Sequence, residues 1–369
     1  MIPGPAARGA RTETRGGGIT TTRIAFLDDD HVLRMMRRLL TARTERDWAE
    51  VTTFFAPDVP DPAMLRSLGT GLTAVPAVAD ADVLILRRGE VSRRLFERNP
   101  SLQLVQRLGA RTDGIDLHAA HEYGVEVACL PRPSLVCTAE HTMLLMLALV
   151  KRLSAAERAM RTGAGSDRPA GAVAYNWAGV AGIGGLAGRT LGVVGLGEVG
   201  GLVAARARAF GMRVLYCGRR RLAAEREVEL GAEYRPIAEL LGEADIVTLH
   251  APGVTVGEPV IGAAEIAAMR PGALLVNTSR GWLVAEDALY DALRAGRLGG
   301  AGLDVHRTEP RPAGDRFCAL NNVVLTPHIA GGSRLEVIDE VARMIDNVRS
   351  VRSGGIPIHG RVVANHDED

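Results

Sequence analysis

Residues 191–200 read LGVVGLGEVG, and the fold class follows from the change of character within this segment. Its first four residues favour a strand, the next six match G-x-G-x-x-G, and residues 202–210 favour a helix. Gly195 permits a tight turn, Gly197 lets the backbone approach a pyrophosphate, and Gly200 lets the helix pack closely on the strand. Because a helix N-terminus offers unpaired N–H groups to phosphates, the pattern predicts a dinucleotide-binding unit rather than an incidental glycine-rich turn.

The end of the next expected strand, residues 213–217, bears on the choice of dinucleotide. Sites for NAD usually carry Asp or Glu there to bind the ribose 2′-hydroxyl. In this chain Gly218 follows the strand, and then Arg219, Arg220 and Arg221. A guanidinium can bind a 2′-phosphate with paired hydrogen bonds, whereas a carboxylate would repel it. We therefore predict NADP(H) as the preferred cofactor with NAD(H) possible; a solvated basic patch is the alternative interpretation.

Short apolar runs alternate with helical patterns on both sides of this motif. Before it, strands are expected at residues 23–27, 83–86 and 102–105, and helices at 92–99, 117–123 and 138–160. From the motif onward, strands are expected at 190–195, 213–217, 246–249, 273–277, 300–305 and 323–325, and helices at 199–210, 265–269 and 286–295. Such alternation is typical of a parallel sheet with helices on both faces, so the prediction is an α/β protein with two parallel-sheet domains of Rossmann-like or flavodoxin-like type.

The composition of the chain excludes several classes of partner. Lys and Arg total 44 against 43 Asp and Glu, so no excess of positive charge indicates nucleic acid or an anionic membrane. The apolar run at residues 143–150 is too short to cross a bilayer and predicts a buried helix. The four cysteines form no C-x-x-C pair, which favours buried thiols in a reducing cytoplasm and no metal site.

Three further segments place polar side chains directly after expected strands, at the edge where open α/β sheets bind ligands. These segments are NTSRG at 277–281, LDVHRTEP at 303–310 and TPHIAGG at 326–332. They would bring an arginine, a glutamate and a histidine beside the nicotinamide.

Those three side chain types suit the reduction of a ketone, which needs a hydride at carbon and a proton at the developing alkoxide. A histidine such as His328 can deliver that proton near neutrality, and a neighbouring carboxylate such as Glu309 stabilises the imidazolium. The fork of Arg280 can fix a 2-keto acid in one orientation. The alternative interpretations are a satisfied core histidine, a helix-capping glutamate and a surface arginine.

Taken together, these motifs resemble the D-isomer-specific 2-hydroxyacid dehydrogenases, the family of D-3-phosphoglycerate dehydrogenase and glyoxylate/hydroxypyruvate reductase. The resemblance runs from about Asp82 to Ile358. It is carried, in order, by DGID at 113–116, AEH at 139–141, the glycine loop at 195–200, NTSRG at 277–281, the segment 304–310 and Pro327-His328.

The resemblance implies roles for individual residues. Arg280 would hold the substrate carboxylate and polarise its carbonyl, His328 would be the acid/base, and Glu309 would be its paired carboxylate. Asp304 would orient the nicotinamide carboxamide. The expected cofactor contacts are Gly195, Gly197, Glu198, Val199, Gly200, Arg219, Arg220, His250, Ala251, Pro252, Thr278, Ser279, Arg280, Asp304, His328 and Gly331. The expected substrate contacts are Arg87, Ala110, Arg111 and Arg280.

The resemblance also implies an order of domains, with the cofactor domain inserted in the substrate domain. The expected segments are a disordered leader at 1–20, a substrate-binding (catalytic) domain at 21–133 completed by 332–360, an NAD(P)-binding Rossmann domain at 134–331, and a polar tail at 361–369. A helix at about 336–349 would cross back to the first domain, and substrate would bind in the cleft between the domains. A homodimer is expected from the resemblance.

Some positions leave alternatives open. Arg111 stands where the family usually has glycine: it could keep the backbone grip on a carboxylate, add a charge for an acidic substrate, or point to solvent. Arg87 has either a substrate or a surface role. His118 and His121 have metal-like spacing, but no third ligand is evident. His306 has no evident partner and is expected to be structural.

Rival functions remain in two classes. One is an NAD-dependent phosphoglycerate, formate or phosphite dehydrogenase, against which the absence of an acidic residue at Gly218 argues. The other is a non-enzymatic dinucleotide-binding protein that resembles the C-terminal-binding-protein corepressors. Oxidation of NADPH by glyoxylate, hydroxypyruvate or another 2-keto acid distinguishes the enzyme from the corepressor-like protein.

Overall fold

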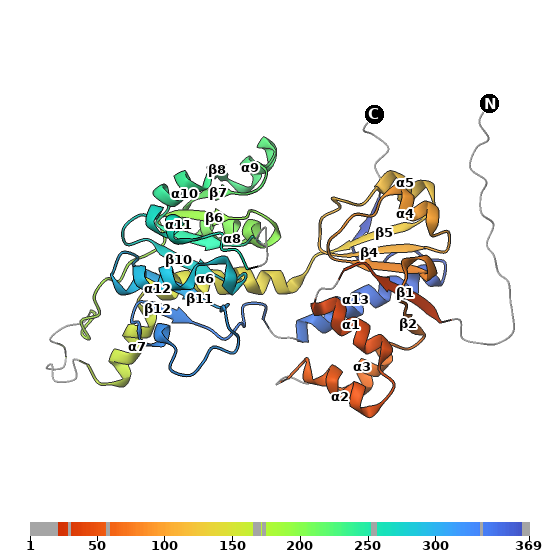
Figure 1. Ribbon diagram of the computed structural model, residues 1–369, viewed down its shortest axis with the longest axis horizontal. Coiled ribbons are helices and arrows are strands. Elements are labelled where there is room, and N and C mark those ends of the chain that lie inside the picture. The colour runs from red at the N-terminus through yellow and green to blue at the C-terminus, as the bar shows by residue number, and fades with distance from the viewer. Residues whose placement is uncertain are drawn as a thin grey trace. The chain divides into compact units, whose positions relative to one another are not determined.

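The computed structural model describes residues 21–28, 31–56, 60–164, 171, 175–251, 257–332 and 335–363. The chain divides into two compact units, unit 1 (residues 1–131 and 337–369) and unit 2 (residues 132–336). Each unit is an α/β structure with its own sheet and its own hydrophobic core (Figure 1). The leader expected at 1–20 lies outside the described residues. Of the polar tail expected at 361–369, residues 364–369 also lie outside them, but Arg361 and Val362 form a strand paired with residues 127 and 128, so the tail does not begin at 361.

Unit 1 is built on a six-stranded sheet in the order β13-β5-β4-β3-β1-β2. Its strands are β1 (Thr22–Phe26), β2 (Leu72–Ala74), β3 (Val83–Leu86), β4 (Leu104–Leu108), β5 (Glu126–Leu130) and β13 (Arg361–Val362). Its helices are α1 (His31–Thr41), α2 (Glu45–Thr53), α3 (Pro62–Leu68), the 3-10 turn η1 (Val78–Asp80), α4 (Arg93–Arg98), α5 (Leu117–Glu122) and most of α13 (Leu335–Arg352). All strand pairs are parallel except β13 with β5.

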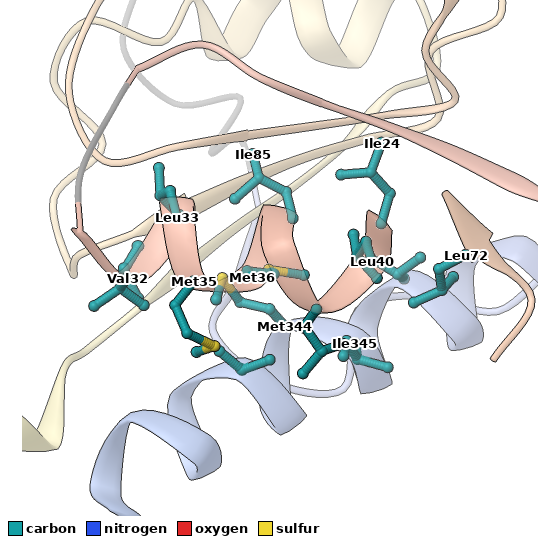
Figure 2. Packing of buried hydrophobic residues seen from close by; sticks show 14 of the residues in the cluster. Ile24, Val32, Leu33, Met35, Met36, Leu40, Leu72, Ile85, Met344 and Ile345 are labelled. Carbon is teal, nitrogen blue, oxygen red and sulfur yellow. The ribbon is translucent and has the colours of Figure 1, made fainter. Parts of the chain in front are cut away.

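The apolar run of β3 shows why the sheet is covered on both faces. Val83 and Ile85 pack into one hydrophobic cluster, whereas Leu84 and Leu86 pack into another. Since successive side chains of a strand point to opposite faces, a strand without polar positions must be covered on both sides. Figure 2 shows the first cluster, in which α1 lies between the strands and α13.

The C-terminal helix α13 returns to unit 1 and is anchored there by a buried amide. Asn347 donates to Gln106 Oε1 on β4 at 2.7 Å and to the carbonyl of His359 at 2.9 Å, and it accepts from the His359 amide at 2.8 Å. Because Asn347 is fully buried, these bonds offset the cost of removing its amide from water.

Unit 2 is built on a seven-stranded parallel sheet in the order β12-β11-β10-β9-β6-β7-β8. Its strands are β6 (Thr190–Val194), β7 (Arg213–Cys217), β8 (Ala232–Tyr234), β9 (Ile246–Leu249), β10 (Leu274–Asn277), β11 (Gly300–Leu303) and β12 (Val323–Leu325). Its helices are α6 (Pro133–Val150), α7 (Leu153–Arg161), α8 (Glu198–Ala209), α9 (Ala224–Leu230), α10 (Ile237–Glu243), α11 (Ala263–Ala268) and α12 (Glu286–Arg294), with 3-10 turns η2 (Gly281–Leu283) and η3 (Arg316–Ala319).

The strand order of unit 2 reverses at one place. From β6 the chain runs outward through β7 and β8, and it then returns to β9 on the other side of β6. In open parallel sheets, ligands bind outside the carboxyl ends of the strands at such a switch point. Gly195 follows β6 and His250 follows β9, so the glycine loop lies at the switch point.

The structure corrects the prediction of one long helix over residues 138–160. Two helices are present, α6 and α7, and Arg152 between them has a φ of 53°. A residue in the left-handed region cannot continue a right-handed helix, so the chain turns there.

Helix α6 belongs to the core of unit 2. By length and composition it is the one helix in the described part of the chain that could cross a membrane, yet half of it is buried. It packs against α8, β10 and β11, and Gly302 of β11 gives it room, because a Cβ there would lie 2.9 Å from Leu145 Cβ. The prediction of a buried helix is confirmed.

Candidate active site

The glycine loop at the start of α8 has the shape that a pyrophosphate requires. Gly195 has a φ of 95°, and a Cβ there would lie 2.7 Å from the amide nitrogen of Ala251. A Cβ on Gly200 would lie 2.3 Å from the carbonyl oxygen of Gly195, so the close packing of helix and strand requires glycine. A Cβ on Gly197, the N-cap of α8, would meet no atom within 4 Å. The loop therefore fits a dinucleotide, with open space in front of the helix N-terminus.

Other expected cofactor contacts flank this loop. Glu198 and Val199 form the half-buried first turn of α8. His250 hydrogen-bonds Thr248 Oγ1 through Nε2 at 3.0 Å, and burial lowers its pKa to about 3, so its imidazole is neutral. The carbonyl of Ala251 accepts from the Ser279 hydroxyl at 3.3 Å. Pro252 lies outside the described residues.

The three arginines after β7 have different surroundings. Arg221 forms a double hydrogen bond with Glu227, at 2.9 Å for each nitrogen, and its guanidinium lies 5.8 Å from the ring centre of Tyr234. The hydrogen bonds from Arg221 and from the Tyr216 hydroxyl lower the pKa of Glu227 to about 2. Arg219 and Arg220 are exposed. Of the three, Arg219 and Arg220 are thus the ones available to a 2′-phosphate.

The loop that carries Arg280 is folded by the residue at the end of β10. Asn277 donates to the carbonyl of Arg280 at 2.9 Å and accepts from the amide of Ser279 at 3.0 Å. The Arg280 guanidinium is exposed and donates to the Ser279 carbonyl at 2.6 Å. Thr278 is buried, and its hydroxyl bonds that of Thr142 on α6 at 2.9 Å. Its expected contact with the cofactor stays a prediction.

Gly281 brings this loop against the loop that carries Glu309. A Cβ on Gly281 would lie 2.0 Å from the carbonyl carbon of His306, so the two backbones touch. The amide of His306 donates to Glu309 Oε1 at 2.8 Å, and Glu309 Oε2 bonds His328 Nδ1 at 2.7 Å. The loops of Arg280, Glu309 and His328 are therefore neighbours in unit 2.

Glu309 and His328 form a contact that remains open to solvent, with exposed fractions of 36% and 50% for their side chains. Burial raises the pKa of Glu309, but hydrogen bonds from His328 and the His306 amide outweigh burial, so the pKa lies below its usual value. His328 itself has a φ of 56°. Strained backbone of this kind persists where the surrounding structure holds it, as it does at many functional sites.

Asp304 stabilises the backbone of the loop that carries His328. Its carboxylate accepts from the Thr326 hydroxyl at 2.6 Å and from the amides of Ile329 and Ala330 at 2.9 and 2.8 Å. The Thr326 hydroxyl also bonds His141 Nε2 at 2.9 Å. Asp304 is completely buried, and both its oxygens bond the histidine loop. Its expected role in orienting the nicotinamide carboxamide stays a prediction. Gly331, after this loop, is exposed.

The structure corrects the expectation that His306 has no partner. Its Nδ1 accepts from Arg311 Nε at 3.0 Å, and its Nε2 bonds the carbonyl of Thr326 at 2.9 Å. Arg311 and His141 were not among the predicted site residues. His141 and Thr326 are 185 positions apart, so local spacing carries no signal for their contact. Arg311 lies five positions after His306, a spacing that does not by itself predict a contact in a loop.

The expected substrate residues Arg87, Ala110 and Arg111 belong to unit 1. Arg87 follows β3 and is half-buried, and Ala110 is exposed. Arg111 is 59% exposed, and its Nε lies 2.7 Å from Asp113 Oδ1, so its charge faces a carboxylate of its own loop. The buried Arg107, which sequence reasoning missed, donates to the carbonyls of Arg87 (3.3 Å) and Asp113 and ties these two segments together.

One histidine of the pair on α5 lies beside a carboxylate that an arginine also binds. His118 Nδ1 lies 3.8 Å from Glu122 Oε2, and the same carboxylate oxygen pairs with Arg93 at 2.8 Å. No group of three or more His, Cys, Asp or Glu side chains in the described residues could hold a metal ion.

The chain is similar in sequence and in fold to known proteins. Residues 143–330 match the profile of the family described as D-isomer specific 2-hydroxyacid dehydrogenase, NAD binding domain. The chain is 38% identical over 287 residues to a glyoxylate reductase of Korarchaeum cryptofilum, and the matched region covers 77% of this chain and 83% of that protein. It is 37% identical over 269 residues to a D-3-phosphoglycerate dehydrogenase of Methanocaldococcus jannaschii, covering 71% and 48%. A solved glyoxylate reductase from Paecilomyes thermophila superposes with a TM-score of 0.57 at 26% identity, covering 93% of this chain and 98% of that chain.

Proposed function

Because the chain belongs to the D-isomer-specific 2-hydroxyacid dehydrogenase family, we propose that it transfers a hydride between NADP(H) and a small 2-keto or D-2-hydroxy acid, as a glyoxylate or hydroxypyruvate reductase does. Oxidoreductase activity on a hydroxy acid with a nicotinamide dinucleotide follows from the family. The observation that carries the proposal is the 2.7 Å contact between Glu309 and His328, in a loop cluster that also holds Arg280.

The glycine loop and the start of α8 would hold the pyrophosphate, and the bound nicotinamide supplies or accepts the hydride. Since Nδ1 of His328 bonds Glu309, Nε2 is the atom left to give a proton to the substrate oxygen. Glu309 stabilises the imidazolium that exists before this transfer. Arg280 binds the substrate carboxylate with its fork and keeps the carbonyl carbon in line for attack. Arg87, Ala110 and Arg111 are proposed as further substrate contacts.

The preference for NADP(H) rests on Arg219 and Arg220, which are exposed beyond the end of β7 where NAD sites usually carry a carboxylate. The experiment measures Kd for NADPH and NADH and then the initial rates with glyoxylate, hydroxypyruvate and phosphohydroxypyruvate. NADPH should bind more tightly, and a double Arg219→Ala, Arg220→Ala variant should lose about tenfold in NADPH affinity and little in NADH affinity. Arg226→Met, an exposed arginine on α9, is the matched control. Tighter binding of NADH to the unaltered protein contradicts this cofactor assignment.

The second candidate is a phosphoglycerate dehydrogenase activity, which the similarity to the Methanocaldococcus jannaschii protein favours. The same panel separates the two, since faster reduction of phosphohydroxypyruvate than of glyoxylate and hydroxypyruvate would select it. A corepressor-like protein would bind the dinucleotide and reduce none of the acids. The resemblance also leads us to propose a homodimer in the cytoplasm.

A further inference from the structure

Behind the Glu309–His328 contact lies an arginine that the catalytic proposal does not use. The side chain of Arg311 is 11% exposed. Its Nη1 donates to Asp315 Oδ1 at 2.6 Å, its Nη2 donates to Glu286 on α12, and its guanidinium lies 5.0 Å from the ring centre of Phe317. Two carboxylates and an aromatic ring thus fix the plane of this guanidinium, because its donors have a rigid geometry.

The Nε donor of Arg311 determines the tautomer of His306. Nε of Arg311 points at Nδ1 of His306 at 3.0 Å, and a guanidinium can only donate. Nδ1 must therefore carry a lone pair, and Nε2 carries the hydrogen that is donated to the Thr326 carbonyl at 2.9 Å. Arg311 thus selects one neutral tautomer of His306 and directs its N–H toward the histidine loop.

His306 reaches both partners of the catalytic contact. Its backbone amide holds Glu309 Oε1 at 2.8 Å, and its ring holds the carbonyl of Thr326, two residues before His328. Glu309 and His328 are too exposed for packing to fix their orientation. Their alignment therefore depends on hydrogen bonds from neighbouring groups, as is usual for preorganised sites. The ionisable groups around this cluster are Glu286 on α12, Asp315 before η3, Asp304 after β11 and His141 on α6.

We propose that Arg311 and His306 are positioning residues, which align Glu309 and His328 for proton transfer. This inference rests on the proposed function and adds to it. Neither residue touches the reacting atoms. Arg311 acts through His306, and His306 acts through Glu309 and the Thr326 peptide.

The test compares His306→Phe and Arg311→Met with Arg316→Met in the full-length protein. Arg316 is a matched control, since its guanidinium also lies over Phe317, at 5.9 Å, but its charged partner is the exposed Asp287. For each variant, kcat and KM for 2-keto acid reduction are measured across pH, together with Kd for NADPH and the midpoint of thermal unfolding. His306→Gln, whose amide can still donate to Thr326, serves as the conservative variant.

We expect kcat to fall about tenfold in His306→Phe and Arg311→Met, because small misplacements of a catalytic group are costly. The fall in rate at high pH should begin at a lower pH, because a misaligned carboxylate stabilises the imidazolium less. Kd for NADPH should stay within about twofold, since the glycine loop is unchanged. His306→Gln should recover part of the loss, and Arg316→Met should behave like the unaltered protein.

The His306→Phe substitution in a Glu309→Gln protein distinguishes failure of this inference from failure of the proposed function. If the His306 ring acts by aligning His328 with the Glu309 carboxylate, His306→Phe should move the pH profile no further in a Glu309→Gln protein. A lower kcat with an unmoved pH profile, or a shift that adds in full to that of Glu309→Gln, overturns the positioning role. By contrast, a protein that reduces no 2-keto acid, or whose Glu309→Gln variant keeps the original profile, overturns the proposed function itself.

Discussion

At the scale of the residue, the proposed proton transfer depends on the carboxylate of Glu309, whose two oxygens bind different groups. Glu309 Oε1 is held by the His306 amide and Oε2 by the imidazole of His328. Despite the opposing effect of burial, these bonds keep the pKa of Glu309 below its usual value. Glu309 is therefore ionised throughout the neutral range, and its negative charge faces the ring of His328.

Glu309→Gln tests this electrostatic role. Reduction needs protonated His328, and the neutral amide stabilises the imidazolium less than the carboxylate does. The fall in the reduction rate at high pH should therefore begin about one pH unit lower. For oxidation, which needs neutral His328, the rise in rate with pH should move in the same direction. A pH series of kcat/KM in both directions checks this, and an unmoved profile in both contradicts it.

The residues that could be predicted from the sequence are those whose motif and strand position coincide. Arg280, Glu309 and His328 each follow an expected strand, and their loops are neighbours in the structure. Arg311 and Asp304 could not be assigned their contacts in this way. The contacts of Arg311 with Glu286 and of Asp304 with Ala330 span 25 and 26 positions, and the loops between them set these contacts. Arg311 also bonds His306 and Asp315, five and four positions away.

At the scale of the element, most strand positions followed from apolar runs, whereas the interior strand β5 and the short edge strands β2, β8 and β13 were not predicted. β3, β7, β9 and β12 have the expected bounds, because each is an almost uninterrupted apolar segment, even though β12 lies at the edge of its sheet. β2, β8 and β13 have two or three residues and each includes a polar one, so no apolar run marks them, unlike the all-apolar edge strand β12. The turn between α6 and α7 falls at Lys151 and Arg152, which are both acceptable inside a helix.

The glycine loop can be tested by comparing alanine substitutions at two of its glycines, Gly197 and Gly200. Gly197→Ala adds a Cβ where the protein has open space, so the unfolding midpoint should change little, while Kd for NADPH should rise about tenfold because the methyl occupies the pyrophosphate's place. Gly200→Ala places its Cβ 2.3 Å from a backbone oxygen and should lower the midpoint even without cofactor. Thermal unfolding and cofactor titration of both variants check this. Equal effects of the two substitutions on NADPH binding and stability would contradict the assignment.

At the scale of the whole molecule, the chain makes two α/β units with separate cores. The proposed proton-transfer pair, the arginine fork and the dinucleotide loop all belong to unit 2, whereas Arg87, Ala110 and Arg111 belong to unit 1. The proposed function draws residues from both units, so hydride transfer by the full-length protein is the property that tests it.

The most direct test is therefore the oxidation of NADPH by glyoxylate or hydroxypyruvate, followed in the unaltered protein, His328→Ala and Arg280→Ala, with Kd for NADPH measured in each. We expect the unaltered protein to turn over at least one of these acids and each variant to be slower by about a hundredfold or more, with nearly unchanged NADPH binding. Near-full activity in either variant, or no reduction of any 2-keto acid with either cofactor, would contradict the account.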